Sequence, residues 1–373
     1  MTATAHRPTV VLIFGGASSE HEISCLTAGG VLRALDPVDY DVIGVGITPS
    51  GAWVRVPLDE VSGYQVRDGV LPRVEGSLPQ AVLLRGPRGA QVATRDGDRL
   101  LDVADVDLAF ALLHGPFGED GTIQGLFEML GVRYVGAGVA ASAVGMDKDL
   151  MKRAMWSAGL PVGRWVAINP GQWARDPQRW TEAVTALGYP VFVKPARGGS
   201  SLGISRVDAA GELAAAVELA LQYDPKVVVE AGFVGCREIE VAVLQGRDGA
   251  PPRASVPGEI VLHRREMFYD FESKYLGTPD VTLDTPAKLA EEQAAAARSL
   301  ATRTFEAMNA EGLARVDLFL NPVGEFFVNE LNTMPGFTAT SMFPLLWQAS
   351  GMDYPTLVRE LIELALNRSL ELR

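Results

Sequence analysis

Four polar side chains near the carboxyl end of the chain could hold a metal ion. They lie in two apolar runs, 313–320 and 325–332, which flank an Asn-Pro-Val-Gly turn and so predict a β-hairpin. The four are Arg315, Asp317, Glu330 and Asn332. Two carboxylates on one half-buried face repel each other and lose solvation unless something binds there. Their oxygens and the amide oxygen suit a hard cation such as Mg²⁺, while an edge hairpin with a solvated polar face is the plainer alternative.

The length of the turn sets the expected register of this hairpin. If residues 321–324 form the loop, Asp317 pairs with Val328 and Arg315 pairs with Glu330. Residues directly opposite each other share a face, and side chains along a strand alternate between the two faces. We therefore expect all four polar side chains on one face of the hairpin.

A lysine followed by a Gly/Ser-rich loop is a candidate for phosphate binding. The strand-like run 189–194 delivers Lys194, the loop Arg197-Gly-Gly-Ser200 follows, and a second apolar run leaves it. Small residues let backbone N–H groups close on phosphate oxygens, and the lysine adds a point charge. This order of strand, loop and strand differs from the strand–loop–helix of a P-loop. A flexible hairpin loop is the alternative, because glycine and serine are enriched in any turn.

Two polar turns in the first third of the chain are expected to form one pocket. The turn at 15–22 follows the first apolar run and contains Glu20, and the turn at 114–121 follows a buried run and begins with His114. Ligands in open α/β sheets gather at the carboxyl ends of strands. A histidine that only packs within its turn is the alternative for His114. The first turn lacks the GxGxxG pattern, so a dinucleotide-binding fold is only weakly indicated.

The elements that must position these side chains point to a multidomain α/β protein. Apolar runs alternate with helical patterns at the start of the chain, as in a parallel sheet, and residues 50–104 indicate an antiparallel elaboration of that first domain. The expected helices are 23–35, 122–130, 147–158, 177–187, 211–223, 286–309 and 354–367. The expected strands outside the hairpin are 9–14, 41–47, 107–113, 164–168, 189–194, 226–231, 236–244 and 255–262. The aromatic segment 263–280 is interpreted as an ordered loop that could cover a site.

Composition restricts the class of protein further. The chain has 373 residues, enough for two or three domains, and its net charge of −13 argues against non-specific binding to nucleic acid or to an anionic membrane. The two cysteines, Cys25 and Cys236, have no metal-ligand spacing and indicate thiols in a reducing compartment. No run approaches the roughly 20 apolar residues of a membrane helix, and the N-terminus lacks an apolar signal core. We expect a cytoplasmic enzyme.

In this combination the motifs resemble those of the D-alanine–D-alanine ligases of the ATP-grasp superfamily. Five stretches carry the resemblance, and they occur in the order of that family over nearly the whole chain. They are Gly15-Gly-x-Ser-x-Glu20-x-Glu22, His114-Gly-x-x-Gly-Glu119-Asp-Gly, Lys194-Pro-x-Arg197-x-Gly-Ser200-Ser, Lys274-Tyr275-Leu, and Arg315-Val-Asp317 with Asn329-Glu330-x-Asn332-Thr-x-Pro335-Gly336. Each stretch alone is weak, whereas the set is specific.

The resemblance implies a three-domain ATP-grasp architecture of α/β class, with α+β topology in its ATP-grasp part. A Rossmann-like domain would span 1–138, a central subdomain 139–233 and a C-terminal subdomain 234–373. The last would contain the covering loop 263–280 and the metal hairpin 313–332. The elaboration at 50–104 resembles the longer variety of the family.

For ATP, the resemblance implies a site between the central and C-terminal domains. The residues that would hold the nucleotide are Lys148, Lys194, Ser200 and Lys274 at the phosphates, Glu230, Ala231 and Phe233 at the adenine, and Glu238 at the ribose. Asp317, Glu330 and Asn332 would bind two Mg²⁺ ions, which Mn²⁺ can replace, with Glu330 bridging them. One carboxylate between two ions fits charge neutralisation in phosphoryl transfer.

For the reaction, the resemblance implies that two D-alanine molecules are joined through an acyl phosphate to make a peptidoglycan precursor. Residues would act as follows: Glu20 and His114 at the first D-alanine, Ser341 and Met342 at the second, Arg315 and the Gly336 N–H at the oxyanion, and Glu20, Ser200 and Tyr275 as a hydrogen-bonded chain to the covering loop. A homodimer is also expected. Two departures from the family pattern are the segment after Glu230, which lacks a Lys-Trp-Leu character, and the additional glycine at 199.

Three alternatives remain at this point. A D-alanine–D-lactate ligase or another ATP-grasp carboxylate–amine ligase is the nearest, but the pair Lys274-Tyr275 favours the dipeptide over the depsipeptide. A nucleotide-binding regulatory protein without catalysis would keep Lys194 and its loop but would not need Arg315 or Gly336. A dehydrogenase is disfavoured because GxGxxG is absent after the first strand.

Overall fold

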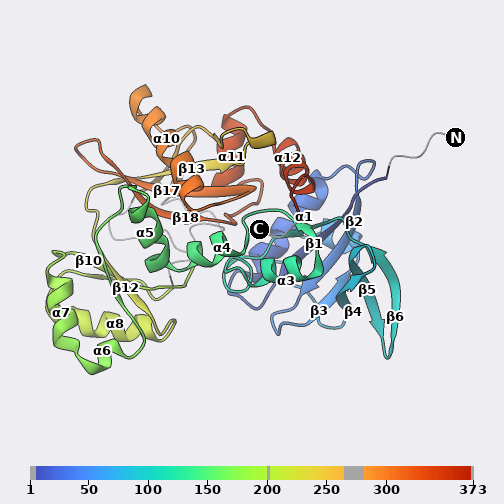
Figure 1. Cartoon of the computed structure of the whole chain (residues 1–373), viewed down its shortest axis with the longest axis horizontal. Coiled ribbons are helices and arrows are strands. Elements are labelled where there is room, and N and C mark those ends of the chain that lie inside the picture. Colours follow the sequence, from blue (N-terminus) through green and yellow to red (C-terminus); the bar gives the residue numbers. More distant parts are fainter. Residues whose placement is uncertain (1–5, 200–201, 264–280, 371–373) are drawn as a thin grey trace.

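The computed structural model describes residues 6–199, 202–263 and 281–370 (Figure 1). Three of the residues singled out above, Ser200, Lys274 and Tyr275, lie outside these ranges, as does most of the expected covering loop. Within the described ranges the chain forms three sheets of eight, four and six strands. No helix in this part of the chain is long and apolar enough to cross a lipid bilayer.

The eight-stranded sheet is built from the first third of the chain, in the order β6-β5-β4-β3-β2-β1-β7-β8. Strands β1, β2, β7 and β8 are parallel, and β3 to β6 extend the sheet antiparallel, as expected for residues 50–104. The strands are β1 (Thr9–Gly15), β2 (Asp41–Ile47), β3 (Trp53–Val56), β4 (Gln80–Gly86), β5 (Gly89–Asp96), β6 (Arg99–Asp105), β7 (Leu108–Ala111) and β8 (Arg133–Tyr134).

Helices cover both faces of this sheet because β1 is apolar and buried from Val10 to Phe14. Alternate residues of β1 pack against α1 (His21–Ala34) and α12 (Tyr354–Leu366) on one face, and against α3 (Thr122–Leu130) on the other. The short α2 (Leu58–Ser62) lies beside α1. The last helix of the chain therefore shares a core with the first strand. Figure 1 shows α12, in red, beside the blue α1.

The four-stranded sheet is antiparallel and has the order β11-β10-β12-β9. Its strands are β9 (Trp165–Ile168), β10 (Val191–Pro195), β11 (Ser205–Val207) and β12 (Val227–Ala231), and the helices beside it are α6 (Gln172–Arg175), α7 (Pro177–Thr185) and α8 (Leu213–Leu221), with α8 preceded by the 3₁₀ turn Ala210–Glu212. The predicted strand–loop–strand around Lys194 is confirmed, since β10 pairs antiparallel with β11.

The six-stranded sheet has the order β16-β15-β13-β17-β18, and the short β14 pairs with β13. Its strands are β13 (Arg237–Leu244), β14 (Arg253–Ala254), β15 (Gly258–Leu262), β16 (Val281–Asp284), β17 (Leu313–Leu320) and β18 (Phe326–Asn332), with a 3₁₀ turn at Arg247–Gly249. One face packs on α10 (Glu291–Ala307) and α5 (Lys148–Ser157). On the other face α11 (Met342–Ala349) joins the core that contains α12.

One expected helix begins later than predicted, and some helices were not predicted. The helix expected over 286–309 begins only at Glu291, because the preceding backbone is bonded to another segment: the N–H of Ala287 donates to the carbonyl of Pro257. The sequence analysis did not anticipate helices α2, α4 (Val139–Met146), α6 and α11. The division of the chain at 138 and 233 stays a prediction.

The register expected for the hairpin is also wrong. Asp317 pairs with Glu330, and Arg315 pairs with Asn332. The register shifts at the step from Asp317 to Leu318, because β18 has a bulge there. The turn itself is one residue longer than expected, since the N–H of Asn321 donates to the carbonyl of Glu325. A bulge places two residues of one strand opposite one residue of the other.

Candidate active site

A single cavity of about 780 Å³ brings together residues from the turns after β1 and β7 and from the four-stranded and six-stranded sheets. Each predicted site residue within the described part of the chain lines this cavity. They are Glu20, His114, Lys148, Lys194, Glu230, Ala231, Phe233, Glu238, Arg315, Asp317, Glu330, Asn332, Gly336, Ser341 and Met342. The predicted union of the turns that carry Glu20 and His114 is confirmed.

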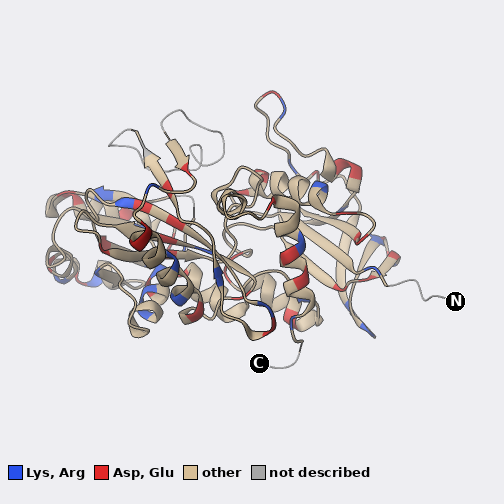
Figure 2. Cartoon of the chain, turned by 90° about the horizontal axis from the view of Figure 1, so that it is seen from above, with Lys and Arg blue, Asp and Glu red and all other residues tan. Residues whose placement is uncertain are grey.

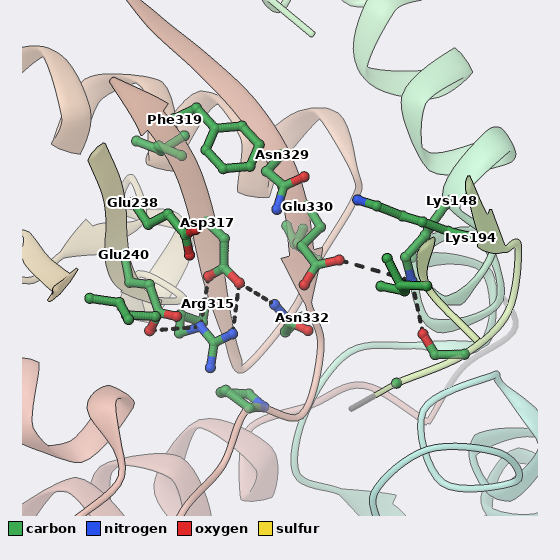
Figure 3. Close-up of a pocket in the computed structure, with 18 of the residues that line it drawn as sticks. Lys148, Lys194, Glu238, Glu240, Arg315, Asp317, Phe319, Asn329, Glu330 and Asn332 are labelled. Carbon is green, nitrogen blue, oxygen red and sulfur yellow. Dashed lines mark hydrogen bonds and ion pairs between the residues drawn. The ribbon is translucent and has the colours of Figure 1, made fainter. Parts of the chain in front are cut away.

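The β18 bulge decides which face of the hairpin carries the polar side chains. Val328 is fully buried in the core below the sheet, although it has the same sequence parity as Glu330, which lines the cavity above. The extra residue, Asn329, changes the alternation between them, so that Asn329 and Glu330 both reach the cavity (Figure 3). Without the bulge, the pairing of Leu318 with Val328 would turn Glu330 toward the core.

Arg315 is the positive centre of this face. Its Nε donates to Asp317 Oδ1 and its Nη2 to Asp317 Oδ2, each at 2.7 Å. The Glu240 carboxylate on β13 lies on its other side, with Oε2 3.1 Å from the Arg315 Nε. Burial lowers the pKa of Arg315, but Asp317 and Glu240 outweigh burial and raise that pKa well above its usual value. The guanidinium is therefore always charged and is fixed between two acids.

Lys148 faces the hairpin from the opposite wall of the cavity. Its Nζ donates to the carbonyl of Gly198 at 2.9 Å and lies 4.0 Å from Glu330 Oε2 (Figure 3). The lysine is the first residue of α5, which Asp147 caps by accepting from the N–H groups of Asp149 and Leu150. A cation at this point, beside the backbone of the Gly/Ser-rich loop, can hold an anion between itself and metal ions bound to Glu330.

The position of α5 depends on a buried ion-pair cluster beneath Lys148. Lys226 Nζ lies 2.9 Å from Asp147 Oδ1 and 2.8 Å from Asp149 Oδ2. The neighbouring Asp224 accepts from Arg197 at 2.8 and 2.9 Å, which fixes the base of the Gly/Ser-rich loop. One cluster of charged side chains therefore holds both the N-terminus of α5 and the base of the Gly/Ser-rich loop.

Glu230 lies at the end of the cavity where β12 finishes, between two lysines. Lys194 Nζ donates to its Oε2 at 2.8 Å, and Lys152 Nζ lies 3.3 Å from its Oε1. Burial would raise the pKa of Glu230, but Lys152 and Lys194 together lower it to about 2. A carboxylate kept ionised in this way is a strong acceptor for an amino group on a bound base.

An aromatic cluster lies beside Glu230 and suits a flat ring. Phe233 stacks on Phe319 with ring centroids 4.8 Å apart and also contacts Phe327 at 5.1 Å. Phe233 and Phe319 both line the cavity. The segment after Glu230, which departs from the usual family pattern, thus supplies an apolar wall.

The opposite end of the cavity lies at the turns that follow the carboxyl ends of β1 and β7. His114 is buried, with Nδ1 3.3 Å from the carbonyl of Met334 and 3.9 Å from Glu119 Oε1. Burial lowers the pKa of His114, but Glu119 and Glu20 outweigh burial and raise it. The Glu20 carboxylate lies close over Gly115, where a Cβ would come 3.4 Å from Oε2 and where φ is +73°. The two carboxylates at this end can receive an ammonium group.

The wall between the hairpin and α11 supplies backbone and hydroxyl groups. Gly336, Ser341 and Met342 line the cavity, and the Ser341 hydroxyl lies 2.7 Å from the hydroxyl of Thr338. Ser341 also precedes α11, whose first N–H groups point toward the N-terminal end of that helix. This end favours a carboxylate.

The donor set on the hairpin suits Mg²⁺. Asp317 and Glu330 offer carboxylate oxygens and Asn332 an amide oxygen on one face, where hard cations prefer oxygen ligands. Over the described ranges no three His, Cys, Asp or Glu side chains gather as a complete metal site. Magnesium bound by carboxylates in proteins commonly takes its further oxygen ligands from nucleotide phosphates and from water.

Some residues of the site were missed by the sequence analysis. Lys152 and Glu240 contact predicted site residues directly, and Phe319 and Asn329 line the cavity. For two of these residues, the spacing in the sequence could have identified them as part of the site. Lys152 follows Lys148 by one helical turn, and Glu240 follows Glu238 by one strand repeat.

Comparison with known proteins places this arrangement in a family. A family model described as the N-terminus of D-ala D-ala ligase matches residues 9–137, and a model described as its C-terminus matches residues 154–363. The D-alanine–D-alanine ligase of Kineococcus radiotolerans is 51% identical over 381 residues, which cover 98% of this chain and 99% of the relative. That of Streptomyces griseus is 48% identical over 380 residues, covering 100% and 96%.

Comparison with solved structures supports the same family. The chain is similar to the VanG D-Ala:D-Ser ligase from Enterococcus faecalis, with a TM-score of 0.82 and 32% identity over 96% of this chain and 100% of that one. It is also similar to the D-alanine–D-alanine ligase from Coxiella burnetii, with a TM-score of 0.77 and 32% identity over 98% and 95% of the two chains. By sequence along its whole length and by its ATP-grasp fold, the chain belongs to the D-alanine–D-alanine ligase family.

Proposed function

We propose that this chain joins two D-alanine molecules into D-alanyl-D-alanine, with conversion of ATP to ADP and phosphate, for peptidoglycan precursor synthesis. The observation that carries the proposal is the cavity itself. Arg315 and the hairpin acids face Lys148 across it, and Glu230 and His114 mark its two ends. Membership of the family supports the same reaction.

ATP would lie along the cavity from the aromatic cluster to the hairpin. Glu230, Ala231 and Phe233 would contact the adenine, and Glu238 would accept from the ribose hydroxyls. Lys148 and Lys194 would hold phosphates, together with Ser200 and Lys274, for which only the family resemblance speaks.

Asp317, Glu330 and Asn332 would hold two Mg²⁺ ions, with Mn²⁺ as a substitute. The ions would supply neutralisation of the charge on the phosphate oxygens. The chain's own contribution is to keep these ligands on one face, which the β18 bulge does.

The reaction would proceed in two steps. A carboxylate oxygen of the first D-alanine attacks the γ-phosphorus, the bond to the ADP oxygen breaks, and an acyl phosphate forms. The free amine of the second D-alanine then attacks the acyl carbon, phosphate leaves, and the amine loses a proton. Arg315 and the Gly336 N–H would stabilise the tetrahedral oxyanion.

The two amino acids would be held at their charged ends. Glu20 would pair with the ammonium group of the first, beside His114, and Ser341 with Met342 would receive the carboxylate of the second. Glu20, Ser200 and Tyr275 would connect the first domain to the covering loop, which must exclude water because an acyl phosphate hydrolyses. A cytoplasmic homodimer with the domain limits 1–138, 139–233 and 234–373 completes the proposal.

The direct test is an assay of ADP release with D-alanine as the sole amino acid, with the product identified by mass spectrometry. We expect D-alanyl-D-alanine and stoichiometric ADP. The assay is repeated with excess D-lactate and with excess D-serine at neutral pH. Preferential formation of a depsipeptide or of a D-alanyl-D-serine product would replace the proposed acceptor, and no ADP release with any D-amino acid would contradict the reaction.

A further inference from the structure

Glu240 is a buried acid that lines the cavity and has no role in the proposed reaction. It lies in the middle of β13, where it pairs with Asp317 on β17 and with Gly258 on β15. Its side chain is 4% exposed, and its Oε2 is 3.1 Å from the Nε of Arg315. Since β13 is bonded on both sides, the carboxylate is held on a rigid part of the sheet.

Asp317 would have to bind both Arg315 and a metal ion through the same carboxylate. Both of its oxygens accept from Arg315, and Oδ2 also accepts from Asn332 Nδ2 at 3.0 Å. The same carboxylate is a proposed metal ligand. A divalent cation and a guanidinium on the same two oxygens repel each other strongly in a buried site. Engagement of Asp317 by a metal therefore loosens its contact with Arg315.

We propose that Glu240 is a positioning residue that retains Arg315 in the cavity when Asp317 turns to the metal. The Arg315 Nε already lies between Asp317 Oδ1 at 2.7 Å and Glu240 Oε2 at 3.1 Å, so the transfer needs only a small movement. A buried guanidinium that lost its only carboxylate partner would be strongly destabilised. With Glu240 present, the guanidinium keeps a partner and stays where the oxyanion would form.

This inference rests on the proposed function, because it assumes that Asp317 binds metal and that Arg315 acts on the reacting carbonyl. It makes a specific statement about coupling. Glu240 should assist metal binding only because Arg315 competes for Asp317. If Glu240 acted simply as one more negative charge near the metal, its removal would weaken binding equally whether or not Arg315 is present.

The test is a double-mutant cycle on Mn²⁺ affinity, measured by electron paramagnetic resonance titration of the full chain with ADP. Glu240→Gln should weaken Mn²⁺ binding about tenfold in the presence of Arg315 and less than about twofold in the Arg315→Met background. Arg315→Met alone should bind Mn²⁺ more tightly than the unaltered chain. Glu259→Gln is the matched control, since Glu259 is on the neighbouring strand and pairs with Arg237 outside the cavity; it should leave Mn²⁺ affinity unchanged.

Kinetics give a second, independent readout. At saturating Mg²⁺, Glu240→Gln should lower kcat about tenfold and change the KM for ATP less than about twofold, whereas a merely structural fault would raise KM as well. If Arg315→Met does not fold, Arg315→Lys replaces it in the cycle, because a lysine cannot bridge two acids with a fork of donors.

The outcomes are separable. Equal losses of Mn²⁺ affinity in both backgrounds, or a larger loss without Arg315, would overturn the role of Glu240 and leave the proposed reaction intact. An ADP complex of the unaltered chain that binds no Mn²⁺ would instead remove the metal site and the proposed function with it.

Discussion

At the scale of single residues, Glu230 shows how one buried charge is kept ionised. Two lysines hold its oxygens, Lys194 at 2.8 Å and Lys152 at 3.3 Å, and Lys152 is almost fully buried itself. Breaking a buried ion pair from one side leaves an uncompensated charge, which is more costly than removing the pair.

We therefore predict that Glu230→Gln, which leaves both lysines without this carboxylate, lowers the free energy of unfolding by about 3–5 kcal/mol. Combination with Lys152→Met should recover part of that loss, because only Lys194 is then left without the carboxylate. Chemical denaturation at pH 7 measures both values. Lys288→Met, which removes an exposed lysine, serves as control and should leave the melting temperature unchanged. Equal destabilisation by the single and the double variant would contradict the interpretation.

The Glu230 carboxylate should also affect how the stability of the fold depends on pH. Because its folded-state pKa is lowered to about 2, below the ordinary value of 4.5, its contribution to stability is complete above pH 4.5 and is lost as the pH falls through about 2. Glu230→Gln should therefore show a shallower loss of stability than the unaltered chain between these pH values. Parallel curves would show that Glu230 titrates normally.

Arg315 is the residue on which turnover should depend most. Arg315→Ala should lower kcat by about 10²–10³, the usual effect of removing an oxyanion donor, and should change the KM for ATP by less than about threefold. Steady-state kinetics with both substrates varied decides this. Comparable changes in kcat and in the KM for ATP would mean that Arg315 binds nucleotide rather than the reacting carbonyl.

At the scale of elements, α5 is the helix whose placement matters most for the nucleotide. It presents Lys148 to the cavity, and its first turn is fixed by Lys226 between Asp147 and Asp149. Without the lysine, the two aspartates repel each other and the first turn shifts.

Lys226→Met should therefore raise the KM for ATP about tenfold while the KM for D-alanine stays within about twofold, and Lys226→Arg should restore most of the ATP affinity. Arg153→Met is the matched control: Arg153 pairs with Asp149 from the exposed side of the same helix and should not affect either constant. A uniform change in both constants with Lys226→Met would indicate a general loss of structure.

The elements also show what the sequence could and could not predict. The apolar runs located the longer helices and most strands that flank the site, and the limits of α3 agree to the residue, since periodicity and terminal glycines mark such elements clearly. The hairpin register was not predictable from the turn alone. The bulge at Asn329 accompanies the burial of Val328 in the core that β18 shares with α5 and α10, a contact between distant segments. Likewise, Ala287 lies outside the helix, and its N–H donates to the carbonyl of Pro257, thirty positions earlier.

At the scale of the whole molecule, the cavity exists because three separate sheets meet. Figure 1 shows the eight-stranded sheet at one end and the other two sheets at the opposite end, with α4 between the two ends and α5 beside β17 and β18. In Figure 2 the basic and acidic residues are interspersed along the ribbon at both ends of the molecule. Motif types and their order predicted the membership of the site. Contacts such as that of Glu240 with Arg315 followed only from the pairing of β13 with β17.

The central claim is that Asp317, Glu330 and Asn332 hold metal ions beside the phosphates of a nucleotide. A crystal structure of the chain with ADP and Mn²⁺, with anomalous difference maps to locate the metal, tests it most directly. We predict anomalous peaks in contact with oxygens of all three side chains and with the terminal phosphate of ADP. Bound ADP with these side chains turned into solvent, and no peak beside them, would contradict the account.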